Sequence, residues 1–458
     1  MKKEEFVMEK IISLCKRRGF IFQGSEIYGG LAGTWDYGPY GVSLRNTIKQ
    51  LWWKRFVDDR MDIFGVDAAI LMNQNVWKAS GHVGGFSDPL VEDLKTKKRF
   101  RADHLLEEQG IDPKGMTLAQ MDALIKEKKL KSPDGNMLGD VRQFNMMFKT
   151  HVGAIQDDSS ISYLRPETAQ GMFVNFKNIL DTFHPKLPFG IAQIGKAFRN
   201  EIAPRDFIFR LRELEQMEIE YFVDPRDEKK VKETFDALYE EQVAFLNDLG
   251  LTHEKIHKVE IAEADRAHYS KRSVDTEFDF PFGQKELLGL AYRTDYDLKA
   301  HTEKSGVDLS YFDEETRSRF IPHCIEPTFG VDRITLAILA DAYREDELGG
   351  EKREYLKLSP KVAPILVAVF PLLKNKPVLV DKAKEVYADL KKVFGAKVSF
   401  DDNGNIGKRY RRQDEIGTPY CVTIDFDTVE KEAGVTVRDR DTGEQERVMM
   451  KDLVAKLV

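Results

Sequence analysis

The chain has 458 residues, of which 42% are hydrophobic and 32% are charged, proportions typical of a globular protein with two or three domains. Its longest apolar run, near residues 364–373, is about half as long as a membrane span requires. The net charge of −7 does not exclude RNA binding, because residues 360–458 carry a slight excess of basic side chains and RNA recognition depends on local patches.

The first residues and the cysteines favour a cytoplasmic protein. Met-Lys-Lys-Glu-Glu-Phe mixes both charge signs and lacks the apolar centre of a signal peptide. Cys15, Cys324 and Cys421 lie far apart without paired spacing, which indicates neither a disulfide framework nor a structural zinc site. We therefore expect a cytoplasmic location.

Two amphipathic helices are predicted near the start of the chain. Apolar side chains recur at helical spacing over residues 4–18 and again over residues 42–61. Residues 34–41 between them are rich in glycine and aromatic residues, which argues against regular helix there. Trp52 and Trp53 point in different directions, so the second helix has more apolar surface than one core face needs. A large buried face or a partner helix would each account for this surplus.

Two segments are predicted to be insertions. Residues 91–145 begin with a basic stretch at 95–104 and continue with charged helical spacing over 118–131. Residues 226–275 carry a helical pattern around 233–249 and are predicted to be a second excursion from the sheet. For the first segment, a solvated, charged excursion explains the composition about as well as a binding element does.

The densest group of opposite charges lies in a predicted antiparallel pair of strands. Residues 191–201 place Arg199 and Glu201 on one face, because side chains two residues apart on a strand point the same way. A loop at 202–206 contains turn residues and leads to a return strand over 207–222. The return strand presents one face made of Arg210, Arg212, Leu214, Gln216, Glu218 and Glu220. Such paired charges predict a site for a polyanion and its counter-ions, whereas a solvated charged strand is the simpler alternative.

The rest of the chain alternates strands and helices. Residues 286–298 are predicted to be a strand, and residues 331–343 an apolar helix that begins after Gly330. Residues 352–360 are predicted to be a linker. An α/β module follows, with strands at 365–370, 398–400 and 420–426, a helix at 378–394 and a glycine-containing stretch at 404–419.

Three separate motifs carry a family resemblance. Residues 198–201 (Phe-Arg-Asn-Glu), followed by a short loop, Arg210 and Leu214, resemble the second signature motif of class II aminoacyl-tRNA synthetases. Residues 165–171 and 325–333 resemble the dimeric glycyl-tRNA synthetases. The motifs occur in the family's order, and the resemblance covers nearly the whole chain.

The resemblance implies a class II fold, an α/β architecture in which helices flank an antiparallel catalytic sheet. The catalytic domain would span residues 1–355, with insertions at about 91–145 and 226–275. An α/β anticodon-binding domain would span residues 356–458, and residues 34–61 are similar to the first signature motif, which builds a dimer interface. The implied activity is glycine–tRNA ligation, with ATP, glycine, tRNA(Gly) and a second copy of the chain as partners and no membrane association.

The resemblance also implies roles for the charged residues. Activation brings the amino-acid carboxylate against the α-phosphate of ATP, and the planar fork of arginine suits both groups. Arg199 would bridge the two reactants and Arg333 would clamp the triphosphate, which makes them the implied catalytic residues. Glu201 would accept the adenine amino group, and Arg210 would meet the γ-phosphate. The implied ATP site comprises Arg199, Asn200, Glu201, Phe209, Arg210, Leu211, Arg212, Glu213, Leu214, Glu286, Leu287, Gly330, Val331, Asp332 and Arg333.

Glycine offers only its ammonium group and the space beside Cα for recognition. By resemblance, Glu167 and Glu218 surround the ammonium group, and Thr328 stands beside Cα where the family often has serine. Every competing amino acid is larger than glycine, so exclusion by size needs no editing domain. The implied substrate site comprises Arg101, Glu167, Leu214, Glu215, Gln216, Met217, Glu218, Glu326, Pro327, Thr328, Phe329 and Gly330.

ATP used in this way implies Mg²⁺, a cation that prefers carboxylate oxygens. Glu286 and Glu326 are the candidate ligands, with a hydrogen-bond anchor as the alternative role for Glu326. The sequence departs from the family at Leu214, where an aromatic residue usually stacks on adenine. Leucine still provides apolar contact but lacks the π face, so the departure bears on the strength of ATP binding.

Two other functions are compatible with parts of the sequence. Another class II synthetase would share the C-terminal module, but residues 165–171 and 325–333 argue against it. A non-catalytic relative would share the scaffold, because fold alone does not define function. Such a protein has no need of the full charged set, which comprises Arg199, Glu201, Arg210, Glu326 and Arg333.

Overall fold

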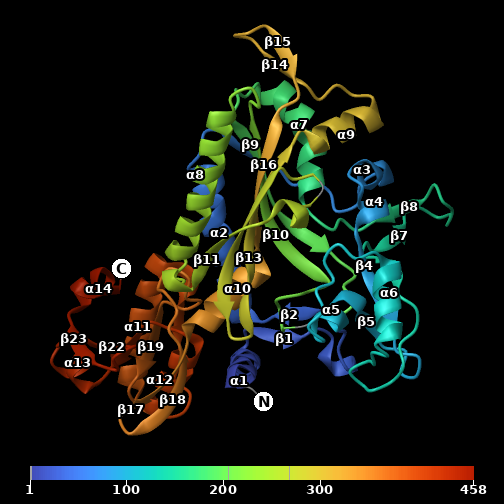
Figure 1. Cartoon of the computed structure of the whole chain (residues 1–458). Coiled ribbons are helices and arrows are strands. Elements are labelled where there is room, and N and C mark those ends of the chain that lie inside the picture. Colours follow the sequence, from blue (N-terminus) through green and yellow to red (C-terminus); the bar gives the residue numbers. More distant parts are fainter. Residues whose placement is uncertain (1–2, 205, 268, 458) are drawn as a thin grey trace.

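The larger lobe is built on a seven-stranded sheet (Figure 1). The computed structural model describes residues 3–204, 206–267 and 269–457. Neighbouring strands of the sheet are antiparallel except for the edge pair β3 and β9, which confirms the predicted antiparallel architecture. In spatial order the strands are β11 (Ile256–Glu260), β12 (Arg272–Phe280), β13 (Gly283–Thr294), β16 (His323–Gly330), β10 (Glu213–Val223), β9 (Phe189–Phe198) and β3 (Ile63–Gly65).

The two faces of this sheet differ in chemistry, because side chains alternate along each strand. Met217 and Ile219 of β10 point into the main apolar core, which α1, α2, α8 and α10 complete. Gln216, Glu218 and Glu220 are buried on the opposite face, part of which α7 covers. The covering helices are α1 (Lys3–Arg18), α2 (Pro39–Trp53), α7 (Ala169–Phe183), α8 (Glu228–Asp248), α9 (Tyr296–Ser305) and α10 (Val331–Ala342). Within the described ranges, no helix is both long and apolar enough to cross a membrane.

The helix α2 begins earlier than the sequence predicted. It starts at Pro39, so the end of the 34–41 segment is helical and the prediction is wrong there. Proline suits the first helical turn because its missing N–H would have no partner in that turn. Glycine is required at position 41, since a Cβ on Gly41 would lie 2.0 Å from the carbonyl oxygen of Phe20.

Both tryptophans of α2 are used within the chain. Trp52 is fully buried and packs edge-on against Phe329 of β16. Trp53 is half-buried and covers Gly65 of β3, where a Cβ would lie 2.4 Å from the indole ring. A π-helical turn, η2 (Lys54–Asp58), follows. The surplus apolar surface of this helix is therefore covered by the chain's own core, which is the first of the two explanations above.

The 91–145 segment contributes to a small unit beside the main sheet. Its strands form a separate three-stranded sheet in the order β5-β4-β6, and its helices pack on an apolar cluster of their own. Thr117 caps the start of α6, and it exchanges hydrogen bonds with Gln120 in a reciprocal cap that stabilises the first turn. The elements between β3 and α7 are α3 (Gln74–Ala79), α4 (His82–Gly85), β4 (Ser87–Glu92), β5 (Arg99–Arg101), α5 (Ala102–Glu107), α6 (Leu118–Glu127), β6 (Arg142–Asn145), β7 (Lys149–His151) and β8 (Ile161–Tyr163).

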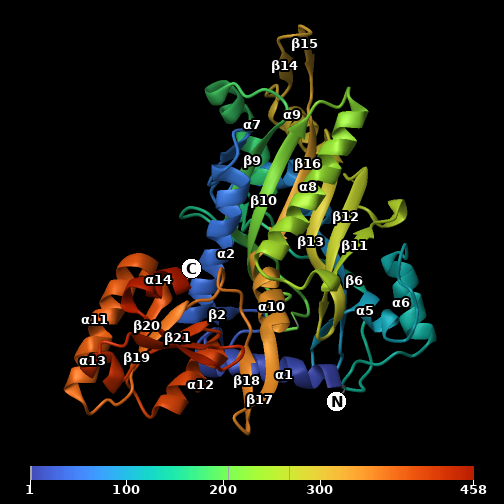
Figure 2. The same ribbon diagram turned by 90° about the vertical axis from the view of Figure 1, so that its left-hand side faces the viewer.

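Two segments that the sequence predicts to be an excursion and a linker contain paired strands. The 226–275 segment forms α8, then β11 and the start of β12, which extend the main sheet at one edge. The predicted linker at 352–360 begins as a strand of a hairpin, whose turn uses Gly349 and Gly350 at positive φ. A further hairpin projects from the far end of the sheet (Figure 2). These hairpins comprise β17 (Tyr343–Leu348) with β18 (Glu351–Leu356), and β14 (Tyr311–Asp313) with β15 (Ser318–Phe320).

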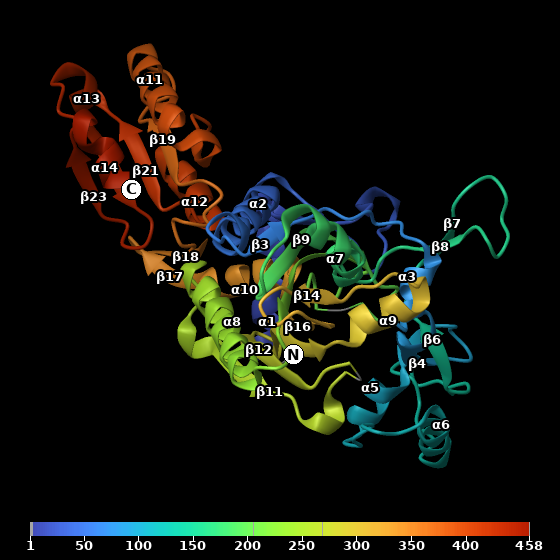
Figure 3. The same ribbon diagram turned by 90° about the horizontal axis from the view of Figure 1, so that it is seen from above.

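The C-terminal module is a five-stranded sheet with helices, as the predicted α/β module requires, and lies across the larger lobe from the 91–145 segment (Figure 3). Its first three strands are parallel, while β22 and β23 add an antiparallel edge that the sequence did not predict. The glycine-containing stretch at 404–419 forms α12, which Asn405 caps at its start and Gly417 ends in the left-handed region. The elements are β19 (Val367–Pro371), α11 (Pro377–Phe394), β20 (Val398–Phe400), α12 (Ile406–Ile416), β21 (Tyr420–Ile424), α13 (Phe426–Glu430), β22 (Val435–Asp439), β23 (Gln445–Val448) and α14 (Leu453–Leu457).

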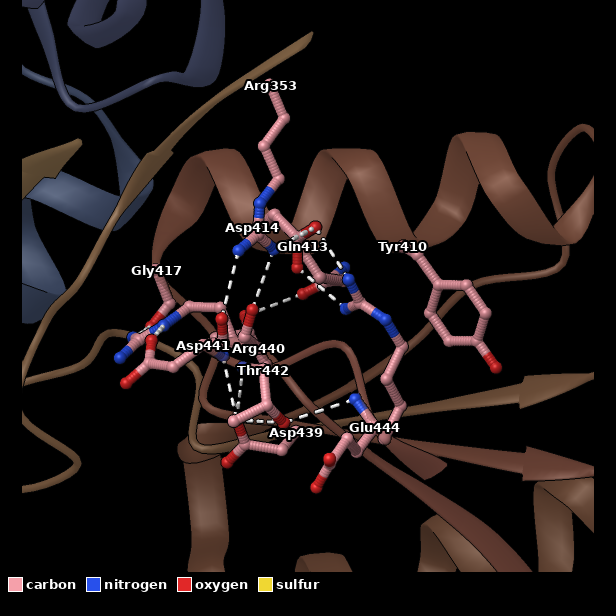
Figure 4. Close-up of polar contacts among 12 residues, drawn as sticks. Arg353, Tyr410, Gln413, Asp414, Gly417, Asp439, Arg440, Asp441, Thr442 and Glu444 are labelled. Carbon is pink, nitrogen blue, oxygen red and sulfur yellow. Dashed lines mark hydrogen bonds and ion pairs between the residues drawn. The ribbon is translucent and has the colours of Figure 1, made fainter. Parts of the chain in front are cut away.

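A buried ionic network joins the C-terminal module to the β17–β18 hairpin (Figure 4). Arg353 of β18 donates to Asp414 of α12 at 3.1 Å and to the carbonyl oxygen of Arg440 at 2.7 Å. Asp414 also accepts two hydrogen bonds from Arg438 of β22, at 2.8 and 3.0 Å. Buried charges of this kind require their partners, so the network holds the two lobes in one arrangement.

The apolar core of the larger lobe extends beyond residue 355. Leu356, Leu358, Val362 and Ile365 all pack in it. Separating the lobes after residue 355 would therefore remove core side chains from the larger lobe.

Candidate active site

A cleft of about 320 Å³ opens where β10 begins and β16 ends. Arginines and carboxylates line it together with apolar side chains, a lining suited to an ionic ligand with an apolar part. The predicted site residues that line this cleft are Arg101, Arg199, Glu201, Phe209, Arg210, Leu211, Leu214, Glu215, Gln216, Glu286, Leu287, Thr328, Gly330, Asp332 and Arg333.

The loop between β9 and β10 carries the arginines of the second motif. β9 ends at Phe198 and β10 begins at Glu213, so the prediction of a strand over residues 207–212 is wrong. Asp206 and Phe207 have φ values of 61° and 59°, and two consecutive residues in this region turn the chain out of the sheet. The strand alternation therefore applies only from residue 213 onward.

Arg210 and Arg212 consequently do not share one face. Arg210 lines the cleft, with Nη1 4.0 Å from a carboxylate oxygen of Glu201. Arg212 instead donates to the carbonyl oxygens of Glu201 at 3.0 Å and Ala32 at 2.8 Å, which fixes the loop against the N-terminal segment. Arg205, also in this loop, lies outside the described residues.

Two further arginines of the cleft are held in place by their neighbours. Arg199 Nε donates to the carbonyl oxygen of Pro166 at 3.0 Å. The guanidinium group of Arg333 lies 4.4 Å from the ring centre of Phe209 and 3.0 Å from a carboxylate oxygen of Glu286. The charge of Arg333 lowers the pKa of Glu286, against the effect of burial. Guanidinium groups fixed in this way are pre-organised to receive phosphate and carboxylate oxygens.

Arg101 brings the 91–145 segment to the cleft. Its Nη1 donates to Asp88 at 2.5 Å, and its Nη2 donates to Asp103 at 2.6 Å. Burial raises the pKa of Asp88 to about 6, while the charge of Arg101 works in the opposite direction. The segment therefore places one cation at the cleft, where Asp103 of the segment and Asp88 just before it hold the cation between them.

Two carboxylates in the cleft wall are engaged by protein groups. Glu215 accepts from Arg45 at 2.8 Å and pairs with Lys49 at 3.2 Å. Asp332 accepts from the Tyr37 hydroxyl at 2.6 Å and from the Glu215 backbone at 2.8 Å. These contacts tie α2 to β10 and α10, so the two carboxylates shape the wall.

A cluster of buried carboxylates adjoins the cleft on β10 and β16. Glu218 lies opposite Thr328 in the strand register. One of its oxygens accepts from Gln216 at 2.8 Å, and the other accepts from the backbone N–H and hydroxyl of Thr168. Burial raises the pKa of Glu218, and the charge of Glu167 raises it further.

Arg293 is the buried cation of this carboxylate cluster. Its Nη1 donates to both oxygens of Glu326 at 3.0 Å, and its Nε and Nη2 donate to Asp297 at 2.8 Å. Burial raises the pKa of Glu326 to about 8; Arg293 opposes this shift, while Glu218 and Glu167 add to it. The cluster therefore contains more carboxylates than Arg293 alone can neutralise, a charge balance that favours a cationic ligand.

Glu167 completes the cluster from the segment before α7. One of its oxygens accepts from Gln170 at 3.0 Å, and the other lies 3.3 Å from Nε2 of His82. Burial alone would raise the pKa of Glu167, but the charges of His82 and Arg293 and the Gln170 hydrogen bond hold it well below its usual range. Glu167 is thus an ionised acid in a largely buried position.

Comparison with known proteins assigns the chain to a family. Residues 148–342 match the tRNA synthetase class II core domain (G, H, P, S and T), and residues 366–458 match the anticodon binding domain. The chain is 52% identical over 449 residues to glycine–tRNA ligase of Caldanaerobacter subterraneus subsp. tengcongensis, covering 96% of this chain and 95% of that protein. It is 51% identical over 461 residues to the Clostridium acetobutylicum enzyme of the same name, covering 98% of each chain. The chain belongs to the glycine–tRNA ligase family.

The other residues implied by the glycine–tRNA ligase family lie beside the cleft or beneath it. Glu167, Glu218 and Glu326 form the carboxylate cluster. Met217, Phe329 and Val331 face the apolar core, and Pro327 is buried in β16. Asn200, Arg212 and Glu213 make contacts next to the cleft, with Met146, Glu201 and Lys196 respectively.

Sequence reasoning missed several members of the carboxylate cluster. His82, Arg293 and Asp297 lie outside the three motifs, and the sequence analysis gave them no role. Arg293 does carry a signal, because it directly follows the apolar stretch 287–292 of β13, and an arginine buried there rarely lacks an acidic partner. That signal predicts a buried ion pair but does not identify Glu326 as the partner.

The two candidate metal ligands, Glu286 and Glu326, lie in different surroundings. Glu286 lines the cleft beside Arg333, whereas Glu326 binds Arg293 in the carboxylate cluster. Among the described residues, no group of three or more histidine, cysteine, aspartate or glutamate side chains is arranged to hold a metal ion. Of the two carboxylates, only Glu286 is placed to join a metal that arrives with a triphosphate.

Proposed function

We propose that this chain activates glycine with ATP to form glycyl-adenylate and then transfers glycine to the 3′ end of tRNA(Gly). The observation that carries the proposal is the junction of the cleft and the carboxylate cluster. Gln216 lines the cleft and donates to Glu218, and Thr328 lines the cleft opposite Glu218. A cavity rich in arginine thus adjoins buried carboxylates, as binding of a triphosphate beside an ammonium group requires.

The cleft arginines support the first chemical step. A carboxylate oxygen of glycine attacks the α-phosphorus of ATP, and the bond from that phosphorus to pyrophosphate breaks. Arg199 contacts both reactants in this proposal, and Arg210 and Arg333 bind the remaining phosphates. Because the guanidinium groups of Arg199 and Arg333 are held in place before ATP binds, little reorganisation is needed as charge builds on the phosphate oxygens. Glu201 accepts a hydrogen bond from the adenine amino group.

Glycine is selected by charge at one end and by size at the other. Glu167 and Glu218 receive the ammonium group, and their other partners hold both carboxylates in position. Thr328 limits the space beside Cα. A larger amino acid must place its side chain against this wall, so steric exclusion supplies the discrimination.

The second step uses the 3′ end of tRNA(Gly). A terminal ribose hydroxyl attacks the glycyl carbonyl carbon, and AMP leaves. We assign catalysis to residues 1–355 and anticodon binding to residues 356–458, where the C-terminal module reads an unpaired loop through base edges and stacking. The 91–145 segment, which brings Arg101 to the cleft, lies near the acceptor end in this arrangement.

Mg²⁺ enters this proposal together with ATP. Phosphate oxygens and water supply most of the ligands of such an ion, and the protein adds one or two carboxylates. Glu286 is the residue of this chain placed to do so. Bound there, the ion would neutralise phosphate charge.

We further propose that the chain acts as a homodimer in the cytoplasm, with an interface through residues 34–61. The core of the chain covers Trp52 and Trp53, so they do not support the interface. Support comes from the preceding loop, where Ile27 and Tyr28 expose 88% and 87% of their surfaces. Sedimentation equilibrium at micromolar concentration tests this assembly, and a monomer would contradict it.

The decisive experiment is amino-acid-dependent exchange of pyrophosphate into ATP. Each of the twenty amino acids is tested with the full chain, and glycine alone should support rapid exchange. Charging of tRNA(Gly) transcripts with labelled glycine then tests the second step. Exchange with another amino acid but not with glycine would refute the proposal.

A further inference from the structure

The carboxylate cluster has a support that comes from outside the main sheet. His82 is the first residue of α4, directly after Gly81, whose φ of 82° allows the chain to turn there. This turn directs His82 Nε2 to a position 3.3 Å from Glu167. The side chains of His82 and Glu167 are only 10% and 13% exposed. The contact is therefore made away from bulk water, where a charged hydrogen bond is strongest.

The imidazole ring of His82 is held by two aromatic rings and a hydroxyl group. Trp77 packs edge-on against it, with 5.6 Å between the two ring centres. The ring centre of Phe86 lies 5.4 Å from that of His82. The hydroxyl group of the buried Ser80 lies 2.8 Å from Nδ1. With Nδ1 occupied by this hydroxyl, Nε2 is the ring nitrogen that serves Glu167. A ring held in this way fixes the position of its partner as well.

Glu167 depends on this contact because its other side-chain hydrogen-bond donor is the neutral amide of Gln170. Gln170 donates to the second oxygen and also to Asp297 at 2.9 Å, so its amide group is shared between two acids. Without His82, one oxygen of Glu167 would lose its partner in a largely buried site. A buried carboxylate that loses a hydrogen-bond partner tends to take up a proton or to rotate away. Either response would weaken binding of an ammonium group.

We propose that His82 is a positioning residue that holds Glu167 in place and thereby sets the affinity of the cluster for the ammonium group of glycine. The inference rests on the proposed function of this site. His82 acts through Glu167 and does not itself contact the substrate. Its effect is accordingly specific for glycine, because the triphosphate binds at the arginines of the neighbouring cleft.

The test compares His82→Ala and His82→Gln with the unmodified chain in the pyrophosphate exchange assay. For H82A we expect KM for glycine to rise about ten- to hundredfold, the range lost with one hydrogen bond to a charged group. KM for ATP should stay within about twofold. H82Q retains an amide donor of similar reach and should recover part of the loss. Thermal melting of each variant shows whether the fold is retained.

His257 provides a control. Its Nε2 lies 3.0 Å from Asp279 in a more exposed histidine–carboxylate pair, located on β11 and β12 away from the cleft. His257→Ala should leave both KM values unchanged.

Several outcomes would overturn the inference. A folded H82A variant with unchanged KM for glycine would do so, as would equal increases in KM for glycine and for ATP. If H82A does not fold, an H82Q variant that binds glycine no better than a Glu167→Ala variant also contradicts the partial recovery expected. Failure of the unmodified chain to exchange with glycine would refute the proposed function instead, so the two failures are distinguishable.

Discussion

Glycine binding should strengthen as the pH rises from about 6.5 to about 8.5. Burial raises the pKa of Glu326 from 4.5 to about 8; Arg293 opposes the shift, and the charges of Glu218 and Glu167 add to it. The free protein at neutral pH therefore retains a proton in the carboxylate cluster. The ammonium group of glycine favours the ionised cluster, so glycine must displace that proton when it binds.

The size of the effect follows from the ionised fraction of the cluster. If glycine binds only the ionised form, the apparent Kd is the intrinsic Kd divided by that fraction. With a pKa of about 8 for Glu326, the ionised fraction is about 3% at pH 6.5 and about 75% at pH 8.5. The affinity for glycine should thus increase about 25-fold across this range.

Isothermal titration calorimetry measures both parts of this prediction. Titrations with glycine at several pH values give Kd, and buffers with different ionisation enthalpies give the number of protons released. Glu326→Gln removes the titrating group and should flatten the pH dependence. A glycine affinity that is constant within twofold from pH 6.5 to 8.5 would refute the reasoning.

The same proton has an opposite effect on the stability of the free protein. Because the folded-state pKa of Glu326 is raised, the folded state binds more protons than the unfolded state between about pH 4.5 and about pH 8. Its contribution to the free energy of unfolding is present at low pH and is lost as the pH rises through that window. Saturating glycine should offset this loss, so the increase in Tm on adding glycine should be larger at pH 8.5 than at pH 6.5.

Three substitutions test other parts of the structure. Arg199→Ala should reduce the rate of pyrophosphate exchange about 10²- to 10³-fold, the loss typical of one pre-organised charge-stabilising donor, without lowering Tm. Activity within a few-fold of the unmodified enzyme would contradict the role of Arg199. Leu214→Phe should lower KM for ATP several-fold at unchanged KM for glycine. Base–aromatic stacking contributes about 1–3 kcal/mol, and leucine already supplies part of the contact. An unchanged or higher KM for ATP would mean that residue 214 does not cover adenine. Asp414→Asn should lower the free energy of unfolding by about 3–5 kcal/mol, since it leaves Arg438 buried without its acid and removes one of the two acids that Arg353 binds. Urea unfolding measures that loss, and charging should fall more than exchange does; a variant of native stability would show that the network does not hold the lobes together.

Strand alternation correctly predicted the polar face of β10, and its failure has a local cause. Gln216, Glu218 and Glu220 share the buried polar face, as a two-residue period requires. Extending the same period to Arg210 and Arg212 is wrong, because positive φ values earlier in the loop take these residues out of the sheet. The charged residues after a predicted turn do not indicate where strand pairing begins again. Here the hydrogen-bonded register of β10 with β9 and β16 sets that position at Glu213.

Long-range ion pairs explain most of what the sequence could not predict. The sequence predicts a linker over residues 352–360, yet Arg353 is buried because two acids receive it, Asp346 on the paired strand and Asp414, 61 residues later. His82 and Arg293 belong to the site for the same reason, through Glu167 and Glu326. Burial of a charge depends on its partner, and a partner far along the chain is invisible to a local pattern.

Arg199 couples the two halves of the site electrostatically. Its charge lowers the pKa of Glu286 in the cleft and opposes the upward shift in the pKa of Glu218 in the carboxylate cluster. Phosphate oxygens that bind Arg199 would neutralise part of the positive charge that stabilises ionised Glu218. An ammonium group at Glu218 would supply a positive charge in its place. Each ligand thus compensates for what the other withdraws, and by linkage the gain in affinity must be the same in both directions. A sheet face with arginines at one end and acids at the other therefore favours occupation by both reactants together, which is the state that the reaction needs.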